Sequence, residues 1–95
     1  MGQYDELEWD DDKDRQNKEK HGLPLIAAAA LFKDPDLTDG ESEQIRGGER
    51  RRIAIGGVRG RLVTCIYVWR NERRRIISLR YASRKERRAY TEAKK

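Results

Sequence analysis

The sequence has few of the residues that build metal sites and cross-links. Its 95 residues include one cysteine, Cys65, and one histidine, His21, so no disulfide can form within the chain and no zinc pattern is present. No apolar run approaches the length of a membrane span, and the first residues are acidic, unlike a secretory signal. We therefore expect a cytoplasmic protein with no membrane segment, no metal and no other cofactor.

Hydrophobic residues are also scarce. They make up 36% of the chain, against 41% for charged residues, so there is material for only one small core. The apolar residues nevertheless occur in patterned runs, which a disordered chain lacks. We expect a single domain over residues 1–95, to which a partner would add buried area.

Charge is divided unevenly along the chain. Residues 1–48 hold 13 Asp or Glu against 6 Lys or Arg, whereas residues 49–95 hold 4 against 16, within a net charge of +5. The basic half suits a polyphosphate ligand and the acidic half would repel it. The division predicts one-sided binding of a nucleic acid, although a charge run is often only a solvated surface.

Two helices are predicted in the first third of the chain. Asp10 is a suitable N-cap for a polar surface helix that ends at His21, before Gly22. Its first turn is acidic, which suits the positive end of the helix dipole. The apolar run Leu25–Phe32 predicts a second helix that packs on a sheet, and Asp34-Pro35-Asp36 ends it.

The remaining pattern predicts an antiparallel sheet, giving an α+β fold. Three strands are expected, joined by hairpin-length connections: Arg51–Ile55, Arg61–Trp69 and Arg74–Tyr81. The middle one is apolar on both faces and should be central. A short strand is expected at Leu7–Trp9, and a loop from Leu37 to Gly48 that ends in an edge strand near Gln44–Arg46. No segment is evident to cover the second face of the sheet, which leaves that face available to a partner or an RNA.

The stretch from Arg74 to Tyr90 is the most informative. Ser83 and Glu86 have the spacing of a capping box, so a strand should give way to a helix that opens at Arg84. Guanidinium groups bind phosphate through two parallel hydrogen bonds and stay charged. We expect this corner to aim several of its arginines at one phosphate. The arginines are Arg74, Arg75, Arg80, Arg84, Arg87 and Arg88.

Two parts of the chain together resemble the BrnT toxin family. In the front half the similarity lies in Glu8-Trp9-Asp10, Lys13, Asn17, Lys20-His21-Gly22, Phe32 and Asp34-Pro35, and in the back half in the run Arg75–Tyr90. The resemblance implies a RelE-like fold, with two N-terminal helices, an antiparallel meander and a short C-terminal helix. It also implies the toxin of a bacterial type II toxin–antitoxin pair, an mRNA interferase-like endoribonuclease that cleaves RNA without a metal and inhibits translation and growth.

The same resemblance implies the partners. They are the RNA substrate and a BrnA-like antitoxin with a ribbon-helix-helix DNA-binding half, in a heterotetramer that contacts operator DNA only through the antitoxin. The antitoxin is expected to cover part of the basic groove that Arg61, Arg80 and Arg84 would form.

A wider resemblance to RelE implies catalytic residues. Gly60-Arg61-Leu62-Val63 resembles the strand that carries one catalytic arginine, and Arg84–Tyr90 resembles the segment with a second arginine and, six residues on, a tyrosine. To Arg61 and Arg84 we add Arg80, and expect the three arginines to stabilise the phosphorane. Tyr90 would stack on a base or help proton transfer.

Several other residues have more than one interpretation. His21 is a candidate general base or a helix C-terminal cap, and Lys20 is a rival base, a phosphate ligand or a solvated side chain. Trp9 would stack on a base or pack in the core. Arg75, Arg87 and Arg88 are expected to bind substrate. The alternative function is a non-catalytic RNA- or DNA-binding module, or a structural subunit of an autorepressor complex.

Overall fold

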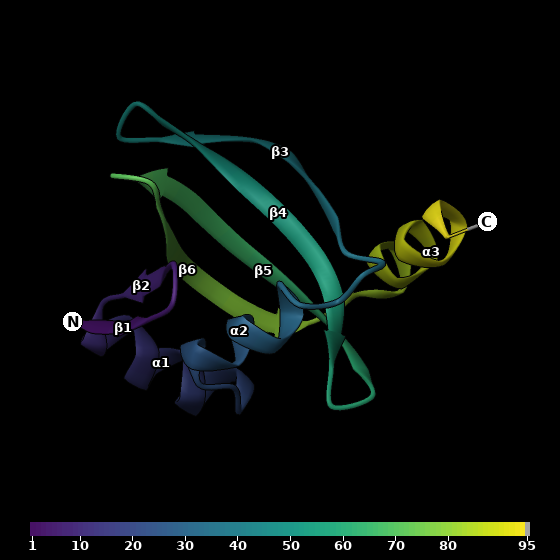
Figure 1. Ribbon diagram of the computed structural model, residues 1–95, viewed down its shortest axis with the longest axis horizontal. Coiled ribbons are helices and arrows are strands. Elements are labelled where there is room, and N and C mark those ends of the chain that lie inside the picture. Colours follow the sequence, from purple (N-terminus) through teal and green to yellow (C-terminus); the bar gives the residue numbers. More distant parts are fainter. Residues whose placement is uncertain (95) are drawn as a thin grey trace.

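The computed structural model describes residues 1–94, except the side chains of Gln44 and Arg46, and contains one mixed sheet with helices on both faces (Figure 1). The elements are β1 (Gly2–Tyr4), β2 (Leu7–Trp9), α1 (Asp11–His21), the 3₁₀ turn η1 (Leu25–Ala27), α2 (Ala28–Leu31), β3 (Thr38–Arg46), β4 (Glu49–Val58), β5 (Arg61–Arg70), β6 (Arg73–Tyr81) and α3 (Arg84–Ala93). The strand order is β1-β2-β6-β5-β4-β3, with β2 and β6 parallel and the other pairs antiparallel. The α+β class is confirmed. No helix in the described residues is long and apolar enough to span a membrane.

The predicted meander is confirmed, and its strands are longer than expected. β5 lies in the middle of the sheet between β4 and β6. Two-residue turns join the strands, and both residues of each turn have positive φ, at Arg59-Gly60 and at Asn71-Glu72. This is the backbone that matches the twist of a tight hairpin.

The predicted loop after Leu37 is wrong, but the edge strand expected near Gln44–Arg46 is confirmed as the end of β3. Residues Thr38–Arg46 form an edge strand, β3, which pairs antiparallel with β4 and has a register shift between Glu41 and Ile45. This segment forms a strand without alternating apolar residues. Backbone hydrogen bonds to β4 and cross-strand ion pairs stabilise it at the edge of the sheet. Asp39 and Glu41 pair with Arg52 and Arg50 of β4, at 3.2 and 3.6 Å.

The predicted second helix is divided into η1 and α2. Its fully buried residues are Leu25, Ala28 and Leu31, which recur every third position. A period of three suits a 3₁₀ turn better than an α-helix, because side chains three residues apart eclipse in the tighter turn. The run does pack on the sheet as expected, against a core that includes Val63 and Tyr67.

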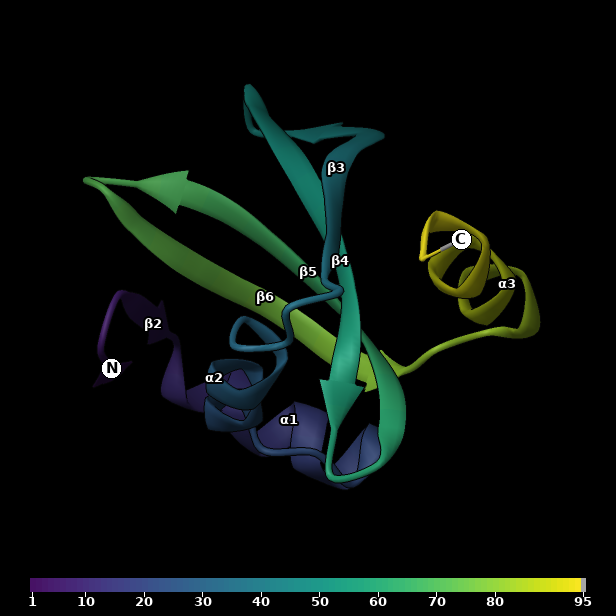
Figure 2. The ribbon, with the colours of Figure 1, turned by 45° about the vertical axis from the view of Figure 1, so that its right-hand side comes forward.

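The two faces of the sheet are covered by different helices (Figure 2). We call the face under η1 and α2 the first face; Val63, Cys65 and Tyr67 of β5 point toward it. On the second face, Ile55 and Leu62 pack against Ala82 and Tyr90, so α3 covers one end of it. Within residues 1–94, the hydrophobic clusters place no helix other than α3 on this face.

Helix α1 is attached to the sheet through one buried amide. Its other residues are polar, as predicted, and Asn17 is its buried residue. The Asn17 side chain donates to the Leu79 carbonyl at 2.7 Å and accepts from the Leu79 N–H at 3.1 Å, as a neighbouring strand would. It also donates to the Leu23 carbonyl at 2.8 Å. Because β2 pairs with β6 only from Arg74 to Ile76, this amide completes the free edge of β6.

Replacing this amide should destabilise the fold. Asn17→Leu keeps a similar volume but leaves the Leu79 N–H and two carbonyls unpaired in the interior, so we expect a loss of about 2–4 kcal/mol in the free energy of unfolding. Urea unfolding followed by circular dichroism measures it. The neighbouring exposed residue provides the control, because Gln16→Leu should change stability by less than about 0.5 kcal/mol. Equal stabilities of the two variants would contradict the role given to Asn17.

Candidate functional site

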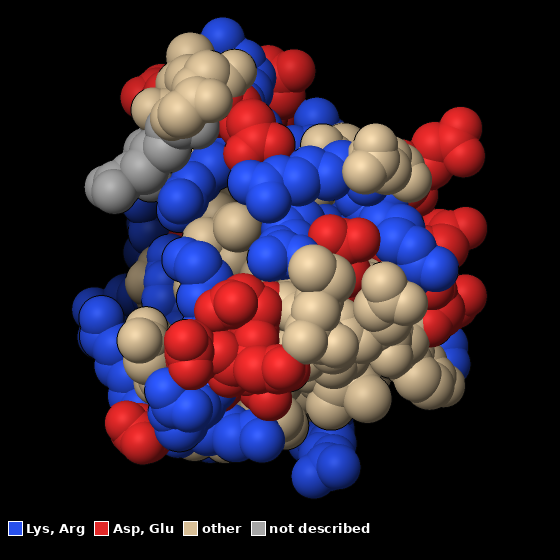
Figure 3. Space-filling view, turned by 90° about the vertical axis from the view of Figure 1, so that its left-hand side faces the viewer, with Lys and Arg blue, Asp and Glu red and all other residues tan. Residues whose placement is uncertain are grey.

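The two oppositely charged halves of the chain are interleaved in the folded protein. Figure 3, which looks at the side of the molecule that carries the N-terminus, shows acidic and basic side chains next to one another. Besides the β3–β4 pairs, Glu6 pairs with Arg74 at 3.6 Å and Glu8 with Arg75 at 3.0 Å. The acidic half of the chain therefore neutralises part of the basic half along β2, β3, β4 and β6, because folding brings the two halves together there.

Helix α3 is different, since most of its cations have no acidic partner. Within residues 1–94, Arg84, Lys85, Arg87 and Arg88 make no ion pair with a described carboxylate. All four side chains are exposed, and Arg87 donates one hydrogen bond to the Ala82 carbonyl at 3.1 Å. The first two turns of α3 thus present positive charge beside the second face of the sheet.

Arg80 is held at the start of α3 by Glu86. Its two terminal nitrogens donate in parallel to the two Glu86 oxygens, at 2.7 and 2.8 Å. Glu86 also accepts from the Ser83 N–H at 2.8 Å, and the Ser83 hydroxyl accepts from the Glu86 N–H at 3.2 Å, so the predicted capping box is confirmed. Thr64 of β5 donates to the same carboxylate at 3.0 Å. The Glu86 carboxylate therefore links β5, the N-terminal cap of α3 and Arg80.

This geometry leaves Arg80 able to bind a further anion. A guanidinium has five N–H donors, and the Glu86 pair takes two of them. The side chain is 37% exposed, whereas that of Glu86 is 15% exposed. The hydrogen bonds from Arg80, with those from Ser83 and Thr64, lower the pKa of Glu86 to about 2. The same pair raises the pKa of Arg80. Arg80 is thus charged, oriented and accessible.

His21 and Lys20 lie beside Ser78 of β6. Both line a shallow cavity of about 160 Å³ between α1 and β6, together with Ile77 and Ser78. Ser78 and Arg80 are two residues apart on one strand, so their side chains share a face. The structure therefore places Lys20 and His21 beside Ser78, two residues from Arg80 on β6, and Arg80 itself does not line this cavity. His21 ends α1, and Gly22 follows in the left-handed conformation, as predicted.

Arg61 lies on the other face, so the expected convergence of Arg61, Arg80 and Arg84 is wrong. Arg80 pairs with Thr64 on β5, three residues from Arg61, and odd and even positions of a strand point to opposite faces. The Arg61 guanidinium rests over the Tyr81 ring, 3.7 Å from its centroid. The two arginines cannot reach one phosphate from opposite sides of a sheet.

Tyr90 is placed where it holds α3 to the sheet. The ring is buried against Ile55 and Leu62, and the hydroxyl donates to Asp34 at 2.7 Å. This hydrogen bond and burial raise the pKa of Tyr90 to about 12. Asp34 also accepts from the Gly57 N–H at 2.8 Å. Tyr90 therefore offers neither a free ring face for a base nor a free hydroxyl for proton transfer in this structure.

Two other candidates are engaged in structural contacts. Trp9 is 7% exposed and belongs to the core, in line with the packing alternative. Arg75 is on the second face but is bound to Glu8 at 3.0 Å. Within residues 1–94 no group of three or more His, Cys, Asp or Glu side chains is placed to hold a metal ion.

Three contributions to this site were not predicted from the sequence: the bonds of Glu86 beyond its cap, the bond from Thr64, and the place of Ser78 beside Lys20 and His21. Glu86 was identified only as a capping residue, and nothing local shows that Thr64, 22 residues earlier, reaches the same carboxylate. The pairing of Arg80 with Glu86 did have a local signal. Glu86 is at the third position of a helix, where its side chain turns back toward the end of the preceding strand.

The Arg80–Glu86 pair should make stability depend on pH. A carboxylate whose pKa is lowered by folding stabilises the fold above its unfolded pKa, near 4.5, and this contribution is lost as pH falls toward about 2. We expect Glu86→Gln to cost about 2 kcal/mol at pH 7, and the difference from the unsubstituted protein to shrink between pH 4.5 and pH 3. Urea unfolding at both pH values measures it, with the exposed Glu92→Gln as control. A cost that does not change with pH would contradict the assignment.

Comparison with known proteins identifies the family. Residues 9–86 match the family described as "Ribonuclease toxin, BrnT, of type II toxin-antitoxin system". A search of curated proteins found no match. The matched region begins in β2 and ends at Glu86, so it includes α1, the meander and the Arg80–Glu86 pair. Because the match covers most of the chain, the protein belongs to the BrnT family of ribonuclease toxins of type II toxin–antitoxin systems.

Proposed function

We propose that this toxin cleaves RNA on the second face of its sheet, with Arg80 as the cation that binds the scissile phosphate. The observation that supports this most is the fixed Arg80–Glu86 pair, which orients a partly exposed guanidinium beside the unpaired cations of α3. The proposed activity is that of an mRNA interferase-like endoribonuclease, a hydrolase that inhibits translation and growth. Residues 1–95 would form one RelE-like domain.

The chemistry uses the ribose 2′-hydroxyl as nucleophile and needs no metal. The 2′-oxygen loses a proton to a base and attacks the adjacent phosphorus, the 5′-oxygen leaves and takes up a proton, and a 2′,3′-cyclic phosphate remains. Arg80 would stabilise the negative charge that builds on the phosphorane, where a preoriented donor is most effective. His21 is the candidate for proton transfer and Lys20 its rival, because both line a cavity with Ser78, two residues from Arg80 on β6.

The exposed arginines of α3 would hold the RNA backbone. Arg84 and Arg88 make no ion pair with a described residue, and α3 begins beside the Arg80 site. Such phosphate contacts position a substrate without reading its bases. Arg75 and Arg87 contribute less in this proposal, because Glu8 and the Ala82 carbonyl already bind them.

We further propose that the antitoxin is BrnA-like, with a ribbon-helix-helix half that contacts operator DNA, and that two toxins join two antitoxins. The membership of the chain in a type II toxin–antitoxin family supports a protein antitoxin. Such a complex would form in the cytoplasm, where the RNA substrate is.

Removing the Arg80 guanidinium should abolish most of the cleavage. We expect Arg80→Ala to lower the cleavage rate about 10²- to 10³-fold, because a preoriented donor to the phosphorane is lost. The measurement is the yield of 2′,3′-cyclic phosphate ends, with a chelator present, on naked RNA and on translating ribosomes. Arg61→Ala is the comparison, since Arg61 lies on the first face.

Three outcomes would contradict the proposed function, each in a different part. Cleavage lost in Arg61→Ala but kept in Arg80→Ala would place the site on the first face. Cleavage lost on addition of the chelator would exclude the metal-free mechanism. RNA binding without cleavage on either substrate would favour the non-catalytic phosphate-binding module.

The proton-transfer group can be identified by paired substitutions. We expect His21→Gln to lower the cleavage rate about 10²-fold or more, because general acid–base catalysis contributes that much. With His21 as the base, Lys20 is left to contact the phosphate backbone, so Lys20→Gln should act mainly on the KM. A rate within threefold of normal in His21→Gln would leave His21 with only its place at the end of α1.

A further inference from the structure

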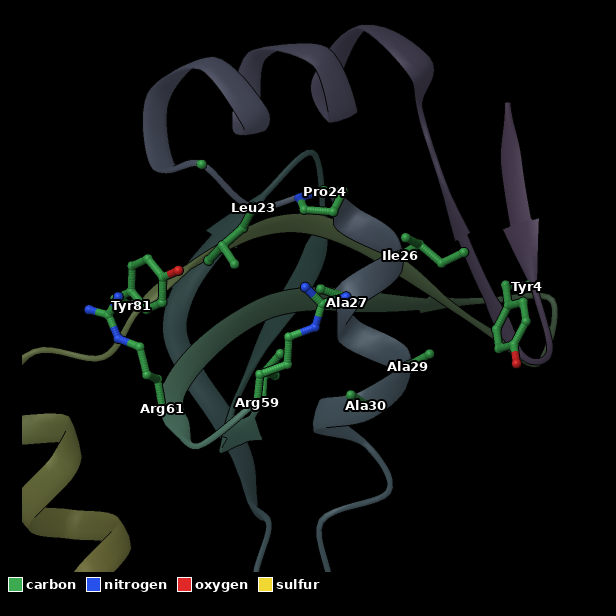
Figure 4. Close-up of a pocket in the computed structure, with 12 residues that line it drawn as sticks. Tyr4, Leu23, Pro24, Ile26, Ala27, Ala29, Ala30, Arg59, Arg61 and Tyr81 are labelled. Carbon is green, nitrogen blue, oxygen red and sulfur yellow. The ribbon is translucent and has the colours of Figure 1, made fainter.

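A groove crosses the first face of the molecule, away from Arg80 (Figure 4). Its volume is about 470 Å³, and it lies between the η1–α2 segment and the β4–β5 hairpin. Figure 4 shows Arg61 and Tyr81 at one end and Tyr4 at the other, with Ile26 and Arg59 between them. This is the size range in which proteins hold drug-sized ligands or the side chains of a partner helix.

The lining of the groove contains unusually exposed apolar side chains. Tyr4 is 46% exposed, Ile26 44% and Tyr81 39%, and only six large hydrophobic residues are exposed in the described part of the chain. The floor between them is made of small aliphatic side chains, including Ala27 and Ala30. In a chain with so little apolar material, this gathering marks an interaction surface.

The charge at the groove has one sign. Arg59 and Arg61 line it, and no Asp or Glu does. Neither arginine forms an ion pair with any described carboxylate, whereas arginines at the opposite end of the sheet do. The Tyr81 ring fixes Arg61 in place from below. An occupant should therefore be apolar where it meets the floor and acidic where it meets these two arginines.

We propose that this groove holds an acidic amphipathic segment of the antitoxin. Aliphatic side chains at i, i+3 and i+4 or i+7 of the segment would contact Ile26 and the alanines, and Asp or Glu side chains would pair with Arg59 and Arg61. The proposal rests on the toxin–antitoxin assignment and specifies its interface. An RNA fits less well, because the aliphatic floor offers no hydrogen-bonding groups to bases.

The location has a consequence for inhibition. A segment seated in the groove contacts the first face, and Arg80 is on the second. The groove therefore anchors the antitoxin without itself covering Arg80, and occlusion of the cleavage site falls to the rest of the antitoxin chain. In this proposal, one part of the antitoxin supplies its affinity for the toxin, and another part inhibits RNA cleavage.

The test measures the affinity of toxin variants for the antitoxin of the same pair. The groove variants are Ile26→Asp and Arg59→Glu, and we expect each to weaken the dissociation constant at least about 30-fold, as at an interface hot spot. The controls make the same changes elsewhere. Ile45→Asp replaces a residue that is 54% exposed on β3, and Arg50→Glu changes a cation of β4. Both controls should stay within threefold.

The outcomes separate the alternatives. Unchanged antitoxin affinity in folded Ile26→Asp and Arg59→Glu would overturn the proposal. It would also be overturned if the toxin alone dimerises and Ile26→Asp separates the copies, or if the variants lose affinity for a 2′-O-methyl RNA and keep that for the antitoxin. The same two variants, free of antitoxin, should cleave RNA at the normal rate. If the unsubstituted toxin does not cleave, the proposed catalytic site fails, and the affinity comparison still decides the groove.

Discussion

The bidentate pair between Arg80 and Glu86 is the interaction on which this site depends. A lone arginine at the end of an edge-proximal strand would have many rotamers, and ordering it on a phosphate would cost conformational entropy. Glu86 removes that cost in advance, and its own orientation comes from Ser83 and Thr64. Because the pKa of Glu86 is lowered to about 2, the pair stays ionised throughout the physiological range. The helix cap and the proposed catalytic cation thus share one carboxylate.

Elsewhere in this small, highly charged domain, single side chains also make several stabilising contacts. Single polar side chains join elements that have little apolar surface to bury: Asn17 ties α1 to β6, and Asp34 ties Gly57 of β4 to Tyr90 of α3. The acidic N-terminal half neutralises arginines of the basic half through cross-strand pairs. Among the described residues, the cations without an ion pair include those of α3 and the two arginines of the first-face groove, Arg59 and Arg61. These two surfaces differ, since the groove is lined by aliphatic side chains.

Local signals predicted the elements, and non-local pairing decided the site. The start of α1 at Asp10, its end at Gly22 and the capping box at Ser83 each depend on residues within one turn, so the sequence was sufficient for them. The sequence indicates only the end of β3, near Gln44–Arg46, because its partner, β4, supplies the hydrogen bonds and cations that hold the rest.

The face on which Arg61 and Arg80 lie also depends on strand register. A bulge in β6 next to Ile77 shifts the pairing with β5, and no local pattern shows where such a shift occurs. The parallel pairing of β2 with β6, and the use of Asn17 in place of a strand, are likewise contacts between distant segments. The family resemblance is confirmed at the level of a ribonuclease toxin of a type II toxin–antitoxin system, whereas the carry-over of single arginines did not reveal which of them share a surface.

The most direct test of this account is to map a bound, uncleavable RNA on the folded protein. Nuclear magnetic resonance of the toxin titrated with a 2′-O-methyl oligonucleotide would report the backbone amides and arginine Nε–H groups that change. The account predicts the largest changes at Ser78, Arg80 and the first turn of α3, with Arg59 and Arg61 little affected. Changes centred on Arg59, Arg61 and Tyr81, with Arg80 unmoved, would contradict it.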